Sequence, residues 1–225
     1  MTTAGETTRI VSDTAIVSGS SHGHLQVQCI LYQLAPEKAA RTAEFVDCAA
    51  RHAIAKGLID KATLTFGDCS PTPAFDRAAQ ALLKAKCTHL ADVTVAFFNQ
   101  NLGHGGGQNR LLARSTADLT LILNPDIIVA PNLLIEMICA LQRPGVGLVE
   151  ARQMPSEHPK DFDPLTGQTS WGSGACLLLR TMLLRDLGGF DDEAFFMYCD
   201  DVDLCWRARL AGFGVVYQPT AVCFH

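Results

Sequence analysis

The 225-residue sequence contains no apolar run close to the roughly 18 residues that a membrane-spanning helix needs. Its first residues, MTTAGETTRIVSDTAIVSGSSHGH, lack a cationic start followed by an apolar segment, so we expect no signal peptide. Lysine and arginine form no block or stripe, and the net charge is -5, which argues against a nucleic-acid-binding surface. These absences favour a cytoplasmic protein with a small or neutral ligand and at most a peripheral contact with the inner face of a membrane.

Cysteine is frequent, but no two cysteines have the CxxC spacing of a metal or redox motif. The nine cysteines are scattered singly, and their number is odd. Most have apolar neighbours in the sequence, so we expect them to be small buried side chains in a reducing compartment. A chain of this length can bury one full core. We therefore expect a single domain over residues 24–225, preceded by a flexible or accessory arm over residues 1–23.

Short apolar runs alternate with helical patterns along most of the chain. Strands are expected near residues 25–32, 62–66, 92–98, 118–123, 147–150 and 215–217, and residues 177–179 form a further apolar stretch. Helices are expected between most of these strands, and the glycine-rich stretch 99–109 is expected to be a loop followed by a short helix to residue 115. The alternation predicts an α/β fold, namely a Rossmann-like domain with a mostly parallel central sheet flanked by helices.

The stretch Asp118 to Ile127, DLTLILNPDI, is predicted to deliver a carboxylate to the end of a buried strand. Its apolar run is typical of a strand that is buried on both faces, and Pro125 ends the run because it cannot donate to the ladder. Open α/β sheets bind ligands beyond the carboxyl ends of their strands, where Asp126 would lie. The alternative is that Asn124-Pro125-Asp126 is only a turn that caps the next helix.

Two further acidic or glycine-rich stretches allow either a functional or a structural interpretation. Asp200, Asp201 and Asp203 crowd a predicted first helical turn, where they stabilise the helix dipole or supply a general base. Arg207 is placed to pair with Asp203. The segment 101–109 brings four glycines close to two asparagines, which suits a close backbone approach to a ligand or a structural turn.

The order of these motifs resembles family 2 glycosyltransferases of the GT-A fold, in particular bacterial rhamnosyltransferase-like enzymes. The segments that carry the resemblance are NQNLGHGGGQN, NPD, SGAC, GGFD and FFMYCDDVDLCWR, followed by a Pro-x-x-x-x-x-His ending. They occur in the expected order between about residue 25 and residue 225. The resemblance therefore covers nearly the whole chain.

The resemblance implies a role for each matching position. Asp126 matches the last acid of the DxD-type motif, which holds Mg²⁺ or Mn²⁺ against the donor diphosphate, and His225 matches a histidine that completes the metal site. Asp201 matches the base that deprotonates the acceptor hydroxyl, and Asp200 stands where glutamate is usual, which leaves the choice between the two aspartates open. The other matching positions would bind the nucleoside-diphosphate sugar, and they are Tyr32, Gln33, Asp68, Asn101, Gly103, Asn109, Asn124, Trp171 and Gly174.

The implied reaction is an inverting transfer of a sugar to a hydroxyl of a glycan or glycolipid acceptor, within cell-wall or surface polysaccharide synthesis. One displacement needs a base and no second carboxylate as nucleophile. Two alternatives are a sugar-1-phosphate nucleotidyltransferase and an inactive carbohydrate-binding domain of the same fold. Gln33-Leu34-Ala35-Pro36 lacks the basic, glycine-rich loop of the nucleotidyltransferases, and the presence of both Asp126 and Asp201 argues against an inactive domain.

Overall fold

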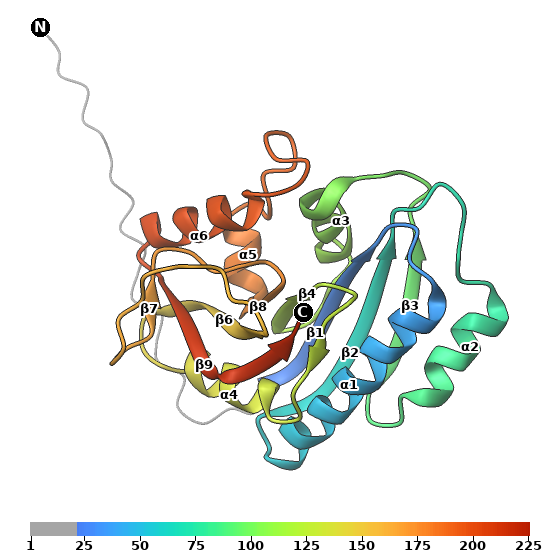
Figure 1. Ribbon diagram of the computed structural model, residues 1–225, viewed down its shortest axis with the longest axis horizontal. Helices are drawn as coiled ribbons and strands as arrows, with labels where there is room; N and C mark the ends of the chain where they lie inside the picture. The colour runs from blue at the N-terminus through green and yellow to red at the C-terminus, as the bar shows by residue number, and fades with distance from the viewer. Residues whose placement is uncertain (1–21) are drawn as a thin grey trace, which may run out of the picture.

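In the computed structural model, which describes residues 22–225, a central mixed sheet is flanked by helices (Figure 1). The expected N-terminal arm lies almost entirely outside the described residues. The strands are β1 (His22–Leu31), β2 (Ile59–Asp68), β3 (Asp92–Phe97), β4 (Leu119–Leu123), β5 (Ile128–Val129), β6 (Val146–Met154), β7 (Gln168–Thr169), β8 (Cys176–Arg180) and β9 (Gly214–Phe224). The helices are α1 (Pro36–Ala55), α2 (Arg77–Lys86), α3 (Gly103–Leu112), α4 (Leu133–Leu141), α5 (Thr181–Asp186) and α6 (Asp200–Leu210).

The sheet is parallel in one half and mixed in the other. Its strand order is β3-β2-β1-β4-β8-β6-β9-β5, and β7 pairs with β9 at the side of this path. The pairs among β1, β2, β3 and β4 are parallel, as expected from the β-α alternation. Strand β8 runs antiparallel to both β4 and β6, and β5 and β7 run antiparallel to β9. The expectation of a mostly parallel sheet is therefore corrected to a mixed sheet, because β8 enters between β4 and β6 in the opposite direction.

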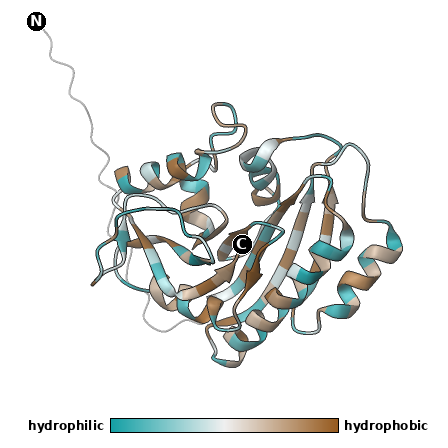
Figure 2. Cartoon of the chain, viewed as in Figure 1, coloured by the Kyte–Doolittle hydropathy of each residue, from teal (hydrophilic) through white to brown (hydrophobic). Residues whose placement is uncertain are grey.

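Apolar side chains cover both faces of the sheet and form two cores. Alternation along β4 shows the division, since Leu121 and Leu123 belong to the core under α1 and α4 whereas Ile122 belongs to the core under α5 and α6. Figure 2 shows the strands mostly in the hydrophobic colour, whereas the helices carry hydrophobic and hydrophilic residues in alternation. This burial on both faces explains why the strands have nearly continuous apolar runs.

Helix α3 begins within the stretch that was expected to be a loop. It starts at Gly103, and the glycines at 103, 105, 106 and 107 lie inside the helix. Glycine disfavours a helix interior, so local propensity alone predicts a loop. Tertiary packing overrides it: a Cβ on Gly107 would lie 2.8 Å from Ile30 Cδ1, and one on Gly103 would lie 2.0 Å from the Phe196 carbonyl oxygen. The glycines let α3 lie directly against β1 and against the segment that precedes α6.

Gly107→Ala is expected to destabilise the fold although alanine is the better helix former. Overpacking a tight contact costs about 1–3 kcal/mol, which exceeds the gain of about 1 kcal/mol in helix propensity. The free energy of unfolding in urea measures the effect. Ile30→Ala in the same chain removes the three side-chain carbons that crowd the site, so it should recover part of the stability. A Gly107→Ala protein as stable as the parent would contradict the packing argument.

Cysteine burial agrees with the sequence prediction for most positions. All nine cysteines are free, and Cys139 and Cys199 are the exposed ones. Within residues 22–225, no helix is both long enough and apolar enough to span a bilayer.

Candidate active site

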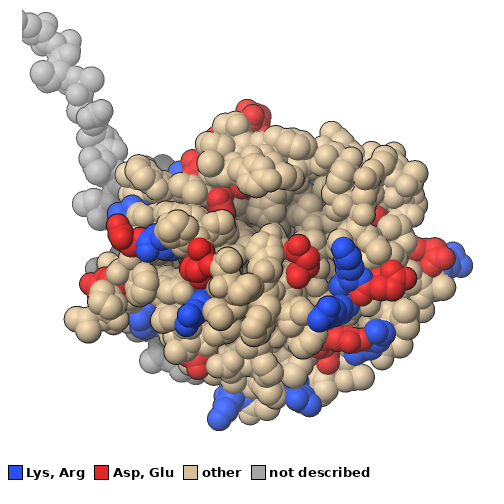
Figure 3. Space-filling view, in the orientation of Figure 1, with Lys and Arg blue, Asp and Glu red and all other residues tan. Residues whose placement is uncertain are grey.

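Several of the predicted site residues lie at the edge of the sheet where the parallel strands have their carboxyl ends. Strained backbone conformations are also found at this edge. Among the described residues, the non-glycine positions with positive φ are Gln33 after β1, Asn99 after β3, and the consecutive pair Tyr198 and Cys199 before α6. Such conformations cost of order 1–3 kcal/mol each and persist where the surrounding structure enforces them, often at functional sites. Figure 3 shows that this face of the molecule is hollowed near its centre.

A cavity of about 390 Å³ opens beside the ends of β1 and β2. Gln33 and Ser70 line it, and the two are joined because the Gln33 N-H donates to Ser70 Oγ at 2.8 Å. Asp68 lies directly behind: its Oδ1 accepts the Ser70 N-H at 3.0 Å. Its Oδ2 is buried without a hydrogen-bond partner among the described residues. Tyr32 is half exposed beside these residues. The structure thus brings Gln33 and Asp68 together as predicted.

Asp126 and His225 approach each other at the end of β4. Asp126 Oδ1 lies 3.6 Å from His225 Nε2, and the Asp126 side chain is 60% exposed. His225 Nδ1 donates to Gln153 Oε1 at 2.9 Å, because an amide oxygen can only accept. In the neutral ring this hydrogen bond leaves the Nε2 lone pair directed toward Asp126 and Asn124, whose Nδ2 is 3.4 Å away. The two predicted metal-binding residues are therefore neighbours, although the interval between them in the sequence is long.

Asp200 and Asp201 have different surroundings at the start of α6. Asp200 is buried, and its Oδ2 is 2.6 Å from His104 Nδ1. Asp201 is partly exposed, and its Oδ2 accepts the Gly174 N-H at 2.7 Å while its Oδ1 accepts the Val202 N-H at 2.8 Å. The geometry leaves lone pairs of Asp201 accessible to a ligand, whereas Asp200 is occupied by His104. The predicted ion pair between Asp203 and Arg207 is present at 2.7 Å.

Two backbone hydrogen bonds join the Asp126 segment to Asp201. The Asn124 N-H donates to the Ala175 carbonyl at 2.9 Å. The preceding residue, Gly174, donates to Asp201. Asn124, two residues before the candidate metal ligand Asp126, and the candidate base Asp201 are therefore bonded to adjacent residues of the segment between β7 and β8. Cβ atoms have little room here, since one built on Gly174 would lie 3.2 Å from His104 and 3.3 Å from Asp201.

The remaining predicted residues have contacts of other kinds. Asn109 holds the turn before α6, since its Nδ2 donates to the Phe190 carbonyl at 2.8 Å and its Oδ1 accepts the Phe190 N-H at 2.8 Å. Asn101 Oδ1 accepts the Gly103 N-H at 3.2 Å, at the first residue of α3. Trp171 packs against Lys160, whose Nζ lies 4.1 Å from the centroid of its ring.

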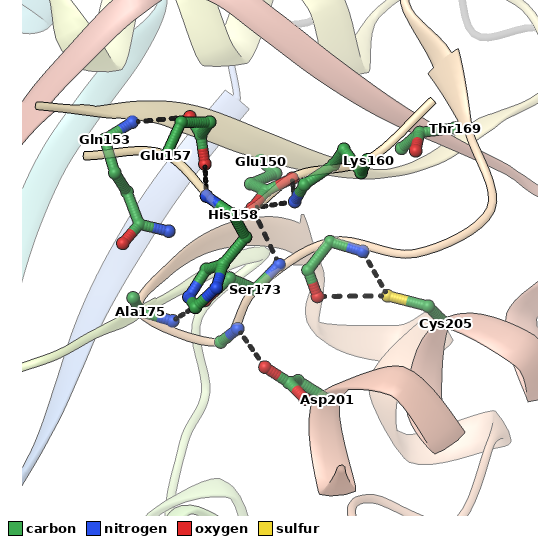
Figure 4. Close-up of polar contacts among 12 residues, drawn as sticks. Glu150, Gln153, Glu157, His158, Lys160, Thr169, Ser173, Ala175, Asp201 and Cys205 are labelled. Carbon is green, nitrogen blue, oxygen red and sulfur yellow. Dashed lines mark hydrogen bonds and ion pairs between the residues drawn. The ribbon is translucent and has the colours of Figure 1, made fainter. Parts of the chain in front are cut away.

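A buried ion pair behind Trp171 is absent from the sequence predictions. Lys160 Nζ lies 2.6 Å from both carboxylate oxygens of Glu150, and Glu150 Oε1 also accepts the Ser173 N-H at 2.8 Å (Figure 4). His104, which contacts Asp200, was likewise not singled out from the sequence. A lone charged residue inside the apolar run of β6 was a signal for Glu150, whereas the sequence carried no signal for its partner.

Solved structures with the GT-A fold match most of this chain. A mannosyltransferase from Pyrobaculum calidifontis, solved with GDP-Man and Mn²⁺, aligns with a TM-score of 0.64 at 16% identity over 89% of this chain and 56% of its own. The structure of GalNAc-T7 with UDP, GalNAc and Mn²⁺ aligns with a TM-score of 0.70 at 10% identity over 89% of this chain and 43% of its own. The domain therefore has the GT-A fold.

Sequence comparisons point to the same group of proteins. The model of the family described as glycosyltransferase like family 2 matches residues 164–225. An N-acetylglucosaminyl-diphospho-decaprenol L-rhamnosyltransferase of Mycobacterium tuberculosis is 30% identical, over 56% of this chain and 56% of its own. Rhamnosyltransferase WbbL of Escherichia coli is 40% identical over 24% of this chain and 20% of its own. An uncharacterised protein of Sinorhizobium fredii is 27% identical, and the match spans only 16% of that protein.

The matches cover about half, or less, of the length of these curated relatives. The resemblance to family 2 glycosyltransferases, with rhamnosyltransferase-like relatives, is nevertheless confirmed.

Proposed function

We propose that this protein is an inverting, metal-dependent glycosyltransferase that moves a sugar from a nucleoside diphosphate to a hydroxyl of a glycan or glycolipid acceptor. The observation that carries the proposal is the connection of Asn124, two residues before Asp126, to Asp201 through the adjacent residues Ala175 and Gly174. It brings a candidate metal ligand and a candidate base to the same part of the sheet edge. A single displacement needs these two functions on opposite sides of the anomeric carbon.

The donor set fits a divalent cation. Asp126 offers an exposed carboxylate, and the hydrogen bond from His225 Nδ1 to Gln153 leaves Nε2 of the neutral ring free to bind. Mg²⁺ and Mn²⁺ accept carboxylate oxygens, with phosphate oxygens and water completing an octahedral shell. When bound, the cation would neutralise the charge that develops on the departing diphosphate. Asn124 lies beside His225 and would border the same diphosphate.

Asp201 is assigned as the base, and Asp200 as the residue that fixes His104 beside it. Asp201 is the more accessible of the two carboxylates, and the N-H groups of Gly174 and Val202 orient it. Tyr32, Gln33 and Asp68 are assigned to the nucleoside, next to the cavity at the ends of β1 and β2. Trp171 is assigned to the wall near the donor sugar and the acceptor. We place the reaction in the cytoplasm, at the inner face of the membrane if the acceptor is a glycolipid.

A panel of nucleotides tests the proposal directly. UDP, dTDP, GDP and their common sugars are added with Mn²⁺, with Mg²⁺ and with EDTA, and the melting temperature is measured. A ligand that binds only the folded state raises the melting temperature. We expect a shift with one nucleotide, dependent on metal, and release of nucleoside diphosphate on turnover. Release of pyrophosphate from a nucleoside triphosphate and a sugar 1-phosphate would favour a nucleotidyltransferase, and no shift with any ligand would favour an inactive domain.

Asp68→Asn is expected to weaken nucleotide binding by about 10-fold or more, because hydrogen bonds to charged groups contribute about 1.5–3 kcal/mol. The unpaired Oδ2 is a buried acceptor, and the substitution presents an amide donor or a neutral oxygen in its place. The melting temperature should stay the same or rise, since an unpaired buried carboxylate is removed. Isothermal titration calorimetry with the nucleotide measures the dissociation constant. Asp76→Asn, at the exposed cap of α2, is the matched control, and equal affinity in both variants would contradict the assignment.

A further inference from the structure

We propose that Lys160 and Glu150 form a positioning pair that holds the segment 171–174, and through it Asp201, in the arrangement that activates the acceptor. The inference rests on the proposed function, because it assigns Asp201 as the base. The pair itself lies outside the predicted donor and metal sites. Its two residues come from different elements, since Glu150 is in β6 and Lys160 is in the loop of residues 155–167 that connects β6 to β7.

The pair is almost completely buried. The side chain of Lys160 is 2% exposed, and that of Glu150 is 0% exposed. Burying two opposite charges requires desolvation, and an apolar pair of similar volume often stabilises a fold equally well. Stability is therefore a weak explanation for the presence of this pair. Its hydrogen bonds indicate a more specific role.

Both members of the pair contact the segment 171–174, from two sides. Glu150 Oε1 accepts the Ser173 N-H at 2.8 Å, and the next residue, Gly174, donates to Asp201 Oδ2 at 2.7 Å. Lys160 Nζ packs on the ring of Trp171, 4.1 Å from its centroid. Figure 4 shows Glu150, Lys160, Ser173 and Asp201 in this sequence of contacts. A displacement of Lys160 would release Trp171, and a displacement of Glu150 would release Ser173. Either change would shift the Gly174 N-H group that orients Asp201.

The loop of residues 155–167, which contains Lys160, is held in place by contacts of its own. Glu157 accepts the N-H groups of Gln153 and His158, at 2.9 and 3.0 Å. Thr169 Oγ1 donates to the Asp161 carbonyl at 2.9 Å. The His158 ring packs at 5.8 Å from the Trp171 ring, between centroids. These contacts fix the loop on both sides of Lys160, so the cation is held against Glu150 by the fold around it.

Glu150 is also placed to make the arrangement sensitive to pH. Burial raises the pKa of Glu150 to about 7, although Lys160 and the Ser173 N-H lower it in part. The carboxylate is therefore charged above about pH 7 and neutral below, so the ion pair is complete on the alkaline side. The titratable groups that interact with Glu150 are Lys160 and Glu157 of the loop, Cys176 of β8, Cys205 of α6 and Tyr217 of β9.

Three variants of the full chain test the pair, namely Lys160→Met, Glu150→Gln and the double variant with both changes. Misplacement of reacting groups by about 1 Å costs on the order of 10²-fold in rate. We expect each variant to lower kcat by about 10-fold or more, with the donor KM within about threefold of the parent. In the parent, kcat should rise with pH through a midpoint near 7, and Glu150→Gln should remove this limb.

The double variant separates positioning from stability. It leaves no unpaired buried charge, so its melting temperature should recover relative to Lys160→Met. We expect kcat to stay low, because the cation that fixes Trp171 is still missing. Recovery of kcat together with the melting temperature would overturn the positioning role. Lys84→Met is the control, since it breaks an exposed ion pair with Asp92, and it should retain the parent kcat.

Fluorescence tests the pair even if the protein turns over no sugar nucleotide. Trp171 is one of two tryptophans, so Trp206→Phe leaves it as the single indole reporter. The Lys160 ammonium over its ring should make the emission follow the charge of Glu150, with a midpoint near pH 7 that Glu150→Gln abolishes. An emission that neither Lys160→Met nor Glu150→Gln changes at any pH would overturn the pair. Failure of turnover with a normal fluorescence transition would instead refute the proposed function alone.

Discussion

Replacing Asp201 by asparagine is expected to lower kcat by about 10²- to 10⁴-fold, the range that a general base contributes. The donor KM should change little, since Asp201 acts on the acceptor hydroxyl. Asparagine has nearly the same size, and its carbonyl oxygen can still accept the Gly174 N-H, so the fold and the segment 171–174 should be retained. Steady-state kinetics with the donor and acceptor at saturation measures the effect.

Two neighbouring aspartates provide the comparison. Asp203→Asn removes a carboxylate from the same turn, but this one is paired with Arg207 and should leave kcat nearly unchanged. Asp200→Asn tests the open choice between the two candidates, because Asp200 is buried against His104. A full loss in Asp200→Asn with near-normal kcat in Asp201→Asn would exchange the roles of the two residues.

Asp126→Ala is expected to abolish the metal-dependent rise in melting temperature with nucleotide and to lower kcat/KM by about 10³-fold or more. A cation that stabilises the leaving group contributes several kcal/mol, and each 1.4 kcal/mol is about tenfold in rate. Asp126 is 60% exposed, so the fold should not depend on it. Thermal shift and turnover with Mn²⁺, Mg²⁺ and EDTA provide the measurements.

A partial loss of metal dependence is expected when the second candidate metal ligand, His225, is replaced. His225→Ala should weaken the metal dependence without abolishing it, because a carboxylate and phosphate oxygens remain as ligands. Asp186→Ala, which removes an exposed carboxylate at the end of α5, is the control. Nucleotide binding that is equally strong in EDTA and in Mn²⁺, in the parent protein, would show that Asp126 has no metal to hold.

The sequence predicted the features that depend on local chemistry. Pro125 ends an apolar run, so the end of β4 and the position of Asp126 beyond it were readable. Pro36 opens α1 as predicted, and the acidic residues before Val202 lie in the first turn of α6. The elements of the parallel half of the sheet also followed from alternation of strand and helix patterns.

The features that were missed depend on contacts between distant segments. The glycines of α3 predict a loop by propensity, and only their contacts with Ile30 and Phe196 explain the helix. The direction of β8 is set by its partners β4 and β6, which periodicity does not reveal. Lys160 belongs to a polar, proline-rich loop, where a lysine is usually solvated, so nothing in its neighbourhood indicated a buried partner in β6.

Strand β9 makes completion of the metal site a late event in folding. Strands β1, β2 and β3 pair with one another across a single intervening helix each, whereas β9 must enter between β6 and β5, which were synthesised much earlier. Such long-range closure loses chain entropy before its contacts form, so we expect it to follow the more local pairing of β1, β2 and β3. His225 follows β9 directly and reaches Asp126 only when that strand is in place. The nucleoside side of the cleft can therefore be assembled well before the protein is able to hold a cation.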